Sequence, residues 1–459
     1  MNEKLPRGTS ISDLQRVGVT RRGVLKVGLA AGAAGLLAPL GAPTVWAKSY
    51  PSLGTFPAGA QGSSVFVGCI PPLTGPYASS GQDMKRGFEL AVEHLNNGSR
   101  ITEAVPSLKK GGGLLGKKIV YQIGDSETKP NSAVQAATQF ARDHHAIMIT
   151  GGVSSAVSIA LEEFGQREKV VVMIGNSGSN ATTGKDCQRY GFRSQPSAYM
   201  AAKGLAPVLA KNLGKSRKAG YLVPDYTYGH SVYNSMKQFT EAAGWKTVTE
   251  QLAPLGTTDF STYLLNIANS GADVFVNVAF GADAVTSTKQ AVQFGMMKKM
   301  KYVVPNISQF QAKELGASLM AGTYGTQGFW WTEENTYPLA KYFVTEFEKK
   351  YHYKPRWGAS EIYLQLIVWA DAVARAGTFY PVAVIKALEA EHKIDTIYGE
   401  VWYRAGDHQM VRPVPVMVGK APAEMKGPED YYHILELVPG TKVMPPLNET
   451  GCHMPPYGA

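Results

Sequence analysis

The stretch that decides the fold is VFVGCIPPLTGP, residues 65–76. Its first half, Val65–Ile70, is an apolar run containing β-branched residues, which predicts a buried strand. A loop rich in Pro, Gly and Ser follows to residue 81. Residues 84–95 then place apolar side chains at helical spacing until Asn97-Gly98 ends the helix. A strand that passes through a loop into a helix is the unit from which parallel α/β sheets are built.

The same unit recurs along the chain in two series. Strands are expected at 65–70, 118–123, 147–149 and 170–174 in the first series, and at 219–223, 246–252, 274–278 and 302–304 in the second. Helices are expected at 84–95, 132–144, after Ser155, and at 198–213, 228–243, 260–269, 283–294 and 359–376. Two successive series predict an α/β fold of two doubly wound lobes, each with a parallel central sheet.

The segments between and beyond the two series indicate the lobe boundaries. No low-complexity linker separates the series, so short crossovers are expected near Arg193–Pro196 and Gly328–Trp331. Beyond them, Thr396–Tyr403 and Val411–Val418 form a hairpin-like pair. The expected N-terminal lobe is 61–195 with 329–395, the C-terminal lobe is 196–328 with 396–440, and 441–459 is a C-terminal tail.

The first 47 residues have the pattern of an export signal. Arg21-Arg22 is followed by a mildly apolar run from 27 to 40 and by Val45-Trp46-Ala47, a small-x-small pattern that a signal peptidase accepts. The alternative is a membrane helix, but the run falls short of the roughly 20 residues needed to span a bilayer. We therefore predict a cleaved twin-arginine signal and a periplasmic protein.

Charge and composition exclude several classes of partner. Residues 1–47 hold six basic and two acidic residues, so their removal lowers the net charge from +10 to about +6. That excess forms no Lys/Arg-rich stripe, which argues against nucleic acid as a partner. No CxxC or His/Cys cluster predicts a metal site.

The chain contains three cysteines. Cys69 lies in an apolar run and is expected to be a buried thiol. Cys187 and Cys452 lie in polar, turn-rich sequence, and in an oxidising periplasm they could pair and hold the C-terminal tail. Spacing alone does not establish that disulfide.

Small polar residues gather in loops that follow predicted strands. These loops are 74–81, 151–155, 175–179 and 225–230. The carboxyl ends of strands in open α/β sheets are where ligands bind, and free N–H groups of helix N-termini suit a carboxylate there. Ordinary N-capping by Ser and Thr is the alternative explanation. Two such sheet edges facing each other predict a ligand cleft between the lobes.

Taken together, these motifs resemble the branched-chain amino-acid-type substrate-binding proteins of ABC transporters, which have the type I periplasmic binding fold. The resemblance extends from about 63 to 415 and rests on the order and spacing of 72–76, 87–91, 124–127, 151–155 and Tyr228-Gly229. We expect a monomeric, non-enzymatic protein without a cofactor. Such a protein captures an amino acid or a related small carboxylate or amide and passes it to the membrane permease of an importer.

The resemblance also implies ligand-binding residues at matching positions. Ser155 resembles the serine that holds the ligand carboxylate. Ser177, Gly178 and Ser179 fall where the family offers a backbone carbonyl and a hydroxyl to the ammonium and carboxylate.

On the second lobe, Tyr228 matches an aromatic residue that closes the cleft, and Phe280 falls where an aromatic residue lines the same wall. Ser80 occupies the position that faces the ligand side chain.

One position departs from the family pattern. Amino-acid binders place an acidic residue after a proline here to pair with the ligand ammonium, whereas this chain has Pro305-Asn306. Asn306 accepts a hydrogen bond but carries no charge. Asp283 is near enough in sequence to be an alternative partner. A carboxylate, amide or aromatic acid is therefore an alternative to an α-amino acid, and Trp330-Trp331 would suit a flat ligand unless they serve only in hinge packing.

Two segments resemble enzyme motifs but do not match them. Gly111–Lys118 resembles a phosphate-binding loop, but it has Lys118 where Ser or Thr is required and it precedes a strand. Gly175–Gly178 lacks the spacing of a nucleophile elbow. A sensory ligand-binding module and, less favoured, a periplasmic enzyme stay as alternatives to the importer component.

Overall fold

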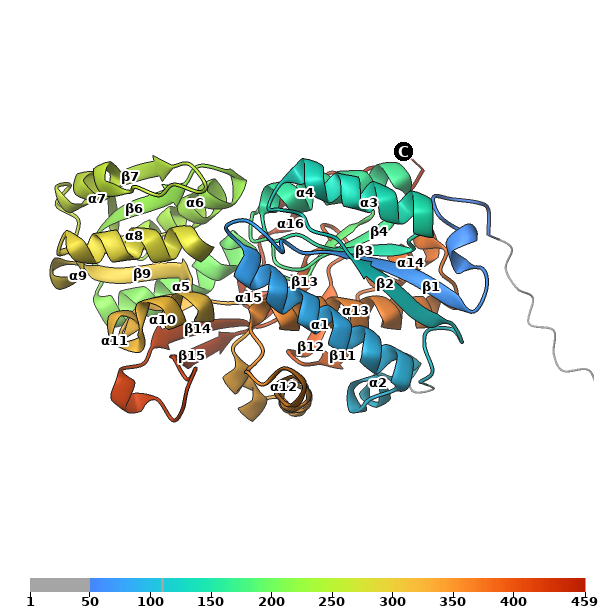
Figure 1. The fold of residues 1–459 in the computed structure, drawn as a ribbon. Coiled ribbons are helices and arrows are strands. Elements are labelled where there is room, and N and C mark those ends of the chain that lie inside the picture. Colours follow the sequence, from blue (N-terminus) through green and yellow to red (C-terminus); the bar gives the residue numbers. More distant parts are fainter. Residues whose placement is uncertain (1–49, 109–110, 459) are drawn as a thin grey trace, which may run out of the picture. The chain divides into compact units, whose positions relative to one another are not determined.

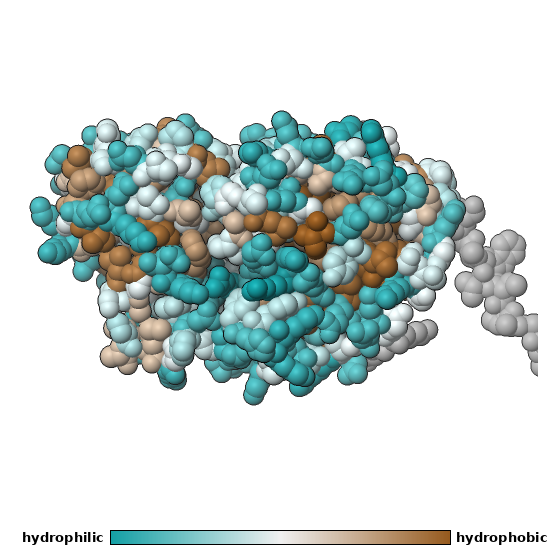
Figure 2. Space-filling view, viewed as in Figure 1, coloured by the Kyte–Doolittle hydropathy of each residue, from teal (hydrophilic) through white to brown (hydrophobic). Residues whose placement is uncertain are grey.

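The structure, a computed structural model, describes residues 50–108 and 111–458. The predicted export signal at 1–47 lies outside the described residues. The predicted α/β fold with two parallel central sheets is confirmed, and Figure 1 shows one sheet in each lobe. Among the described residues, no helix has the length and apolar character needed to cross a membrane. Hydrophilic residues cover most of the face drawn in Figure 2.

The sheet of the first lobe has the strand order β2-β1-β3-β4-β5, with all neighbouring strands parallel. Side chains alternate along β1: Val65 and Val67 pack with helices α1 and α13, whereas Phe66 and Ile70 pack with α3 and α4. Cys69 is buried as a free thiol. The elements are β1 (Ser64–Ile70), β2 (Lys118–Ile123), β3 (Met148–Gly151), β4 (Val171–Ile174), β5 (Gly191–Arg193), α1 (Ala78–Asn97), α3 (Pro130–His144), α4 (Ser155–Glu168) and α13 (Trp357–Ala376).

The sheet of the second lobe has the order β15-β14-β10-β9-β8-β6-β7. Its strands β6 to β10 are parallel, and β14 and β15 extend it in antiparallel fashion. Helices α5 and α6 cover one face, and α7, α8 and α10 cover the other. The elements are β6 (Lys218–Pro224), β7 (Lys246–Ala253), β8 (Val274–Asn277), β9 (Lys301–Asn306), β10 (Tyr324–Thr326), β14 (Val414–Gly419), β15 (Tyr432–Val438), α5 (Ala198–Leu213), α6 (Thr227–Ala242), α7 (Ser261–Ala268), α8 (Gly281–Gln293), α9 (Met296–Lys299), α10 (Gln309–Leu315) and α11 (Ala317–Met320).

The predicted hairpin of 396–403 with 411–418 is wrong for most of its length. A separate small sheet pairs β11 (Ile394–Thr396), β12 (Gly399–Tyr403) and β13 (Met410–Val411), and a bridge from Arg193 to Gln409 links this region to β5. Residues 396–411 therefore lie with the first lobe, and 414–438 lie with the second. The β-branched pattern indicated strands but contained no information about their partners.

Helices and short 3-10 turns outside the two sheets complete the fold. They are α2 (Arg100–Ala104), α12 (Pro338–Tyr351), α14 (Pro381–Glu389), α15 (Gly440–Val443), α16 (Leu447–Thr450), η1 (Ala58–Ala60), η2 (Pro106–Leu108), η3 (Trp331–Asn335) and η4 (Pro422–Glu424).

The lobes are joined by short segments at 194–197, 327–330 and 412–413. The first two were predicted and the third was not. A buried ion pair between Arg412 and Glu361 of α13 ties all three together. The Arg412 guanidinium also donates to the Gly328 carbonyl, and the Ser194 hydroxyl donates to the Glu361 carboxylate at 2.6 Å. The three interlobe segments are therefore organised around this buried charge pair.

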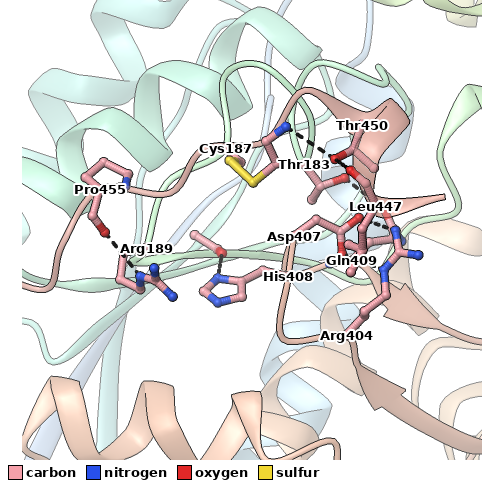
Figure 3. Close-up of a disulfide and its surroundings, with 12 residues drawn as sticks. Thr183, Cys187, Arg189, Arg404, Asp407, His408, Gln409, Leu447, Thr450 and Pro455 are labelled. Carbon is pink, nitrogen blue, oxygen red and sulfur yellow. Dashed lines mark hydrogen bonds and ion pairs between the residues drawn. A yellow bond between two sulfur atoms is a disulfide. The ribbon is translucent and has the colours of Figure 1, made fainter. Parts of the chain in front are cut away.

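The C-terminal tail runs from the second lobe onto the first. Its helix α15 packs on α5, and the Cys187–Cys452 disulfide then joins the tail to the first lobe (Figure 3). The Arg189 guanidinium donates to the Pro455 carbonyl at 3.2 Å. The disulfide that the sequence left open is present in the structure.

Glu389 at the end of α14 makes stability depend on pH. Burial alone would raise the pKa of its carboxyl group, but hydrogen bonds from His408, Tyr457 and Arg189 outweigh burial and lower that pKa to about 2. Because the folded-state pKa lies below the ordinary value of 4.5, the stabilisation is complete above pH 4.5 and is lost as the pH falls towards 2.

We therefore expect Glu389→Gln to lower the melting temperature at pH 7, and we expect the difference from wild type to shrink between pH 5 and pH 3, measured by circular dichroism. Glu400→Gln is the control, because Glu400 is about half exposed and pairs with Lys393 at the surface. A Glu389→Gln difference that is constant over this pH range would contradict the prediction.

Candidate functional site

Three predicted serines meet at the carboxyl edge of the first sheet. Ser155 opens α4 after β3, and 177–179 form the loop after β4. The Ser155 hydroxyl accepts hydrogen bonds from the Ser177 hydroxyl at 3.0 Å and from the Ser179 backbone N–H at 3.1 Å. The three side chains are fully buried. Spacing along parallel strands explains the convergence, because neighbouring strand ends meet at one sheet edge.

Arg193 holds the loop that contains Ser177 and Ser179. Its buried guanidinium donates to the Ser177 carbonyl at 3.4 Å and also to the Ser179 carbonyl. It donates as well to the Gln409 carboxamide oxygen at 2.8 Å, so the small sheet supports the same loop. Burial lowers the pKa of Arg193 to about 10, which leaves it charged at neutral pH. Sequence reasoning placed a crossover at this residue but did not identify this role.

On the second lobe, Tyr228 and Asn306 form a pair. Tyr228 lies in the first turn of α6 and Asn306 ends β9. Burial raises the pKa of Tyr228 to about 12, and a hydrogen bond with the Asn306 side chain opposes that rise. A side chain at Gly178 would lie about 3.1 Å from the Tyr228 ring, so a small residue is needed there. These contacts place the predicted residues of both lobes against one another.

The loops of the two lobes also bond directly to each other. The Tyr77 and Tyr226 hydroxyls are 2.7 Å apart, and the Ser179 hydroxyl lies 2.9 Å from the Ser231 hydroxyl. The Asn180 backbone N–H donates to Ser231 at 3.1 Å. Every one of these bonds must break for the lobes to separate.

Two hollows lie between the lobes. The first is lined by Gly178, Gln195, Tyr228, Asn306 and Gln327, together with apolar side chains of α5 and α6. The second is lined by Ser80, Asp83, Phe280, Gln309, Gln327 and Trp357. Gln327, which follows β10, borders both hollows.

The structure thus distributes the predicted residues over three adjoining places. Ser155, Ser177 and Ser179 form the buried hydroxyl cluster, and other predicted residues line the two hollows. Gly178, Tyr228 and Asn306 line the first, while Ser80 and Phe280 line the second.

Two other sequence hypotheses have different outcomes. The Asp283 carboxylate accepts a hydrogen bond from the Gly256 backbone N–H at 2.8 Å and lines neither hollow. Trp330 packs against Tyr432 in the core of the second lobe, with ring centroids 5.0 Å apart. The hinge-packing explanation of Trp330 is therefore the better one.

Sequence reasoning missed several residues at the hollows. Gln195, Gln309 and Gln327 line them, and the Trp357 indole N–H donates to Gln195 at 2.5 Å. The available signal was that Gln195 lies within one predicted crossover and Gln327 directly precedes the other.

The chemistry of the hollows suits the binding of a polar molecule. Their walls present hydroxyl groups, carboxamides and aromatic rings, and the second hollow adds Asp83 and Arg356. Over residues 50–108 and 111–458, no cluster of His, Cys, Asp and Glu side chains is arranged to hold a metal ion.

A family model and a curated relative both identify similar proteins among the binding proteins. Residues 64–424 match a family model described as periplasmic binding protein. The Leu/Ile/Val-binding protein homolog 8 of Brucella abortus is 28% identical over 344 residues, which cover 72% of this chain and 80% of that protein.

Two solved structures resemble the fold closely. An amino acid ABC transporter substrate-binding protein from Pseudomonas fluorescens Pf-5 is 26% identical with a TM-score of 0.75, covering 85% of this chain and 99% of that chain. A periplasmic binding protein from Burkholderia mallei is 25% identical with a TM-score of 0.76, covering 85% of this chain and 98% of that chain.

Proposed function

Because the chain belongs to the periplasmic binding protein family, we propose that it is the solute-binding component of an ABC importer. In this proposal a twin-arginine signal at 1–47 exports the protein to the periplasm. There, as a monomer, it captures an amino acid or a related small carboxylate or amide and delivers it to a membrane permease.

The observation that carries the proposal is the buried hydroxyl cluster of Ser155, Ser177 and Ser179, opposite Tyr228 and Asn306. A ligand carboxylate at Ser155 would replace the bond from the Ser179 backbone N–H and would accept from the hydroxyl groups. Charge-assisted hydrogen bonds of this kind are about twice as strong as neutral ones. The Ser177 carbonyl, held by Arg193, is the matching acceptor for a ligand donor.

The neutral side chain of Asn306 broadens the ligand class. An ammonium group that leaves water needs strong acceptors, and Asn306 supplies a carboxamide oxygen without a charge. Tight binding of leucine or valine that is lost in Asn306→Ala would show that the carboxamide suffices for an ammonium. Preference for acids that lack an amino group would show that it does not.

Lobe closure follows from the same contacts. Ligand groups that bond to both lobes would add to the Tyr77–Tyr226 and Ser179–Ser231 contacts and favour the closed state.

A thermal-shift screen tests the proposed function. The compounds are proteinogenic amino acids, aliphatic acids, aromatic acids and amides. A ligand at 100 times its Kd should stabilise the protein by about 2.7 kcal/mol, which is an easily measured shift. A shift with at least one member of these classes, without turnover of the compound, is the expected result. No shift with any class, or formation of a product, would contradict the proposal.

A further inference from the structure

The second hollow contains buried polar atoms that find no hydrogen-bond partner in the described part of the chain. Both the nitrogen and the oxygen of the Gln309 carboxamide are unpaired, as are the oxygen of the Gln327 carboxamide and the Nε of Arg356. Gln309 and Gln327 are only 2% and 4% exposed. All three residues line this hollow. Such atoms are costly to leave unpaired, so they indicate what a ligand would supply.

The unpaired atoms form a balanced set. The Gln309 NH₂ group and the Arg356 Nε–H are donors, and Gln309 and Gln327 each provide one carboxamide oxygen as acceptor. A primary carboxamide has an oxygen that accepts two hydrogen bonds and an NH₂ group that donates two. The hollow therefore offers donors to the oxygen of this group and acceptors to its nitrogen.

The charges around the hollow disfavour an ionised group. The two carboxylate oxygens of Asp83 already accept from the Tyr353 hydroxyl at 2.8 Å and from the Ala359 backbone N–H at 2.6 Å. Arg356 lies 4.0 Å from Glu429 and is also close enough to Asp83 to interact with its charge. Since each charge is opposed by another, a ligand ammonium or carboxylate would find no free counter-charge here.

The second hollow adjoins the first, and a residue of the 177–179 loop lines the first. Gln327 borders both hollows, and Gly178, which lines the first, lies between Ser177 and Ser179 in the chain. Phe280 and Trp357, with ring centroids 5.5 Å apart, supply an apolar wall for the carbon skeleton between the two ends of the ligand. A ligand could therefore extend from Ser155 past Gln327 to Gln309.

We propose that this hollow recognises an uncharged primary carboxamide at the end of the ligand distant from its carboxylate. The inference rests on the proposed function and narrows it: the solute is a small organic acid or amino acid that bears a terminal amide. Leucine, isoleucine and valine, whose side chains are hydrocarbon, would leave the Gln309 carboxamide and the Gln327 carboxamide oxygen unpaired.

Calorimetric titration of the purified protein with two sets of shape-matched probes tests this inference. One set is glutamine, glutamate and methionine, and the other is 4-carbamoylbenzoate, terephthalate and 4-methylbenzoate. In a set that binds, we expect the amide to bind at least about tenfold more tightly than its acid and methyl counterparts, because only the amide pairs the buried groups.

Two variants test whether Gln309 is responsible for the preference for the amide. Gln309→Leu should reduce the amide preference to about threefold or less, whereas Gln311→Leu on the same helix should retain it. Gln311 is the matched control because it is buried and bonds to the Tyr302 hydroxyl, away from the hollow. The readout is a ratio of affinities, so a general loss of stability does not alter it.

The possible failures are distinguishable. Acid or methyl probes that bind as tightly as the amide, or a preference that survives in Gln309→Leu, would overturn the inference while leaving the proposed function in place. If no probe of either set binds, the inference is overturned, and if the wider screen is also negative the proposed function falls with it.

Discussion

Replacing Arg412 with methionine is expected to lower the free energy of unfolding by about 3–5 kcal/mol, the usual cost of removing one partner of a buried ion pair. The side chains of Arg412 and Glu361 are both fully buried. Without the guanidinium, the Glu361 carboxylate would be left in the core with hydroxyl donors from Ser194 and Tyr398. The Gly328 carbonyl would also lose its donor. All three interlobe segments would be weakened at once.

Urea denaturation at pH 7, followed by tryptophan fluorescence and circular dichroism, measures this effect. Lys393→Met is the matched control, because the Lys393–Glu400 pair has side chains about half exposed. Exposed pairs contribute at most about 1 kcal/mol. If Arg412→Met lowers the free energy of unfolding no more than Lys393→Met does, the buried pair does not stabilise the interlobe segments. A second replacement, Glu361→Gln, should recover part of the loss because it removes the uncompensated charge.

Removing the Cys187–Cys452 disulfide is also expected to lower the stability of the protein strongly. The bond joins residues 265 positions apart and fixes the C-terminal tail to the first lobe. Linking distant residues restricts the unfolded chain, and native disulfides typically contribute about 2–4 kcal/mol. The Cys187→Ser/Cys452→Ser double variant is therefore expected to unfold at a clearly lower urea concentration than the oxidised wild type.

The reducing agent dithiothreitol provides the control for this prediction. It should destabilise the wild type and a Cys69→Ala variant, because both retain the disulfide, and it should leave the double variant unchanged. Cys69 is a buried free thiol in β1, and burial raises its pKa well above the ordinary value. Equal stability of the oxidised wild type and the double variant would show that the tail adds nothing to the fold.

Periodicity predicted the parts of the fold that rest on local patterns. Residues 198–213 form α5 with the predicted bounds, and the alternating residues of β1 pack in two separate cores. The positions of Ser155, Ser177 and Ser179 followed from the family resemblance, and parallel strand order brings them together.

Features that depend on distant partners could not be predicted in this way. Arginine is usually a surface residue, yet Arg193 and Arg412 are buried, and each pairs with a residue more than 50 positions away in the chain. Nothing local indicated that β14 would join β10 while β13 joined β12. The unpaired amides of Gln309 and Gln327 become evident only when both lobes are in place.

We expect the solute to bind between the lobes at Ser155. Titration of the tightest-binding compound from the screen into wild type, Ser155→Ala and Ser158→Ala tests it most directly. Ser158 lies one turn later in α4 and its hydroxyl bonds only to the Ser154 carbonyl among the described residues, so it controls for loss of a buried hydroxyl. We expect about 10- to 100-fold weaker binding in Ser155→Ala and little change in Ser158→Ala. Wild-type affinity in Ser155→Ala would contradict it.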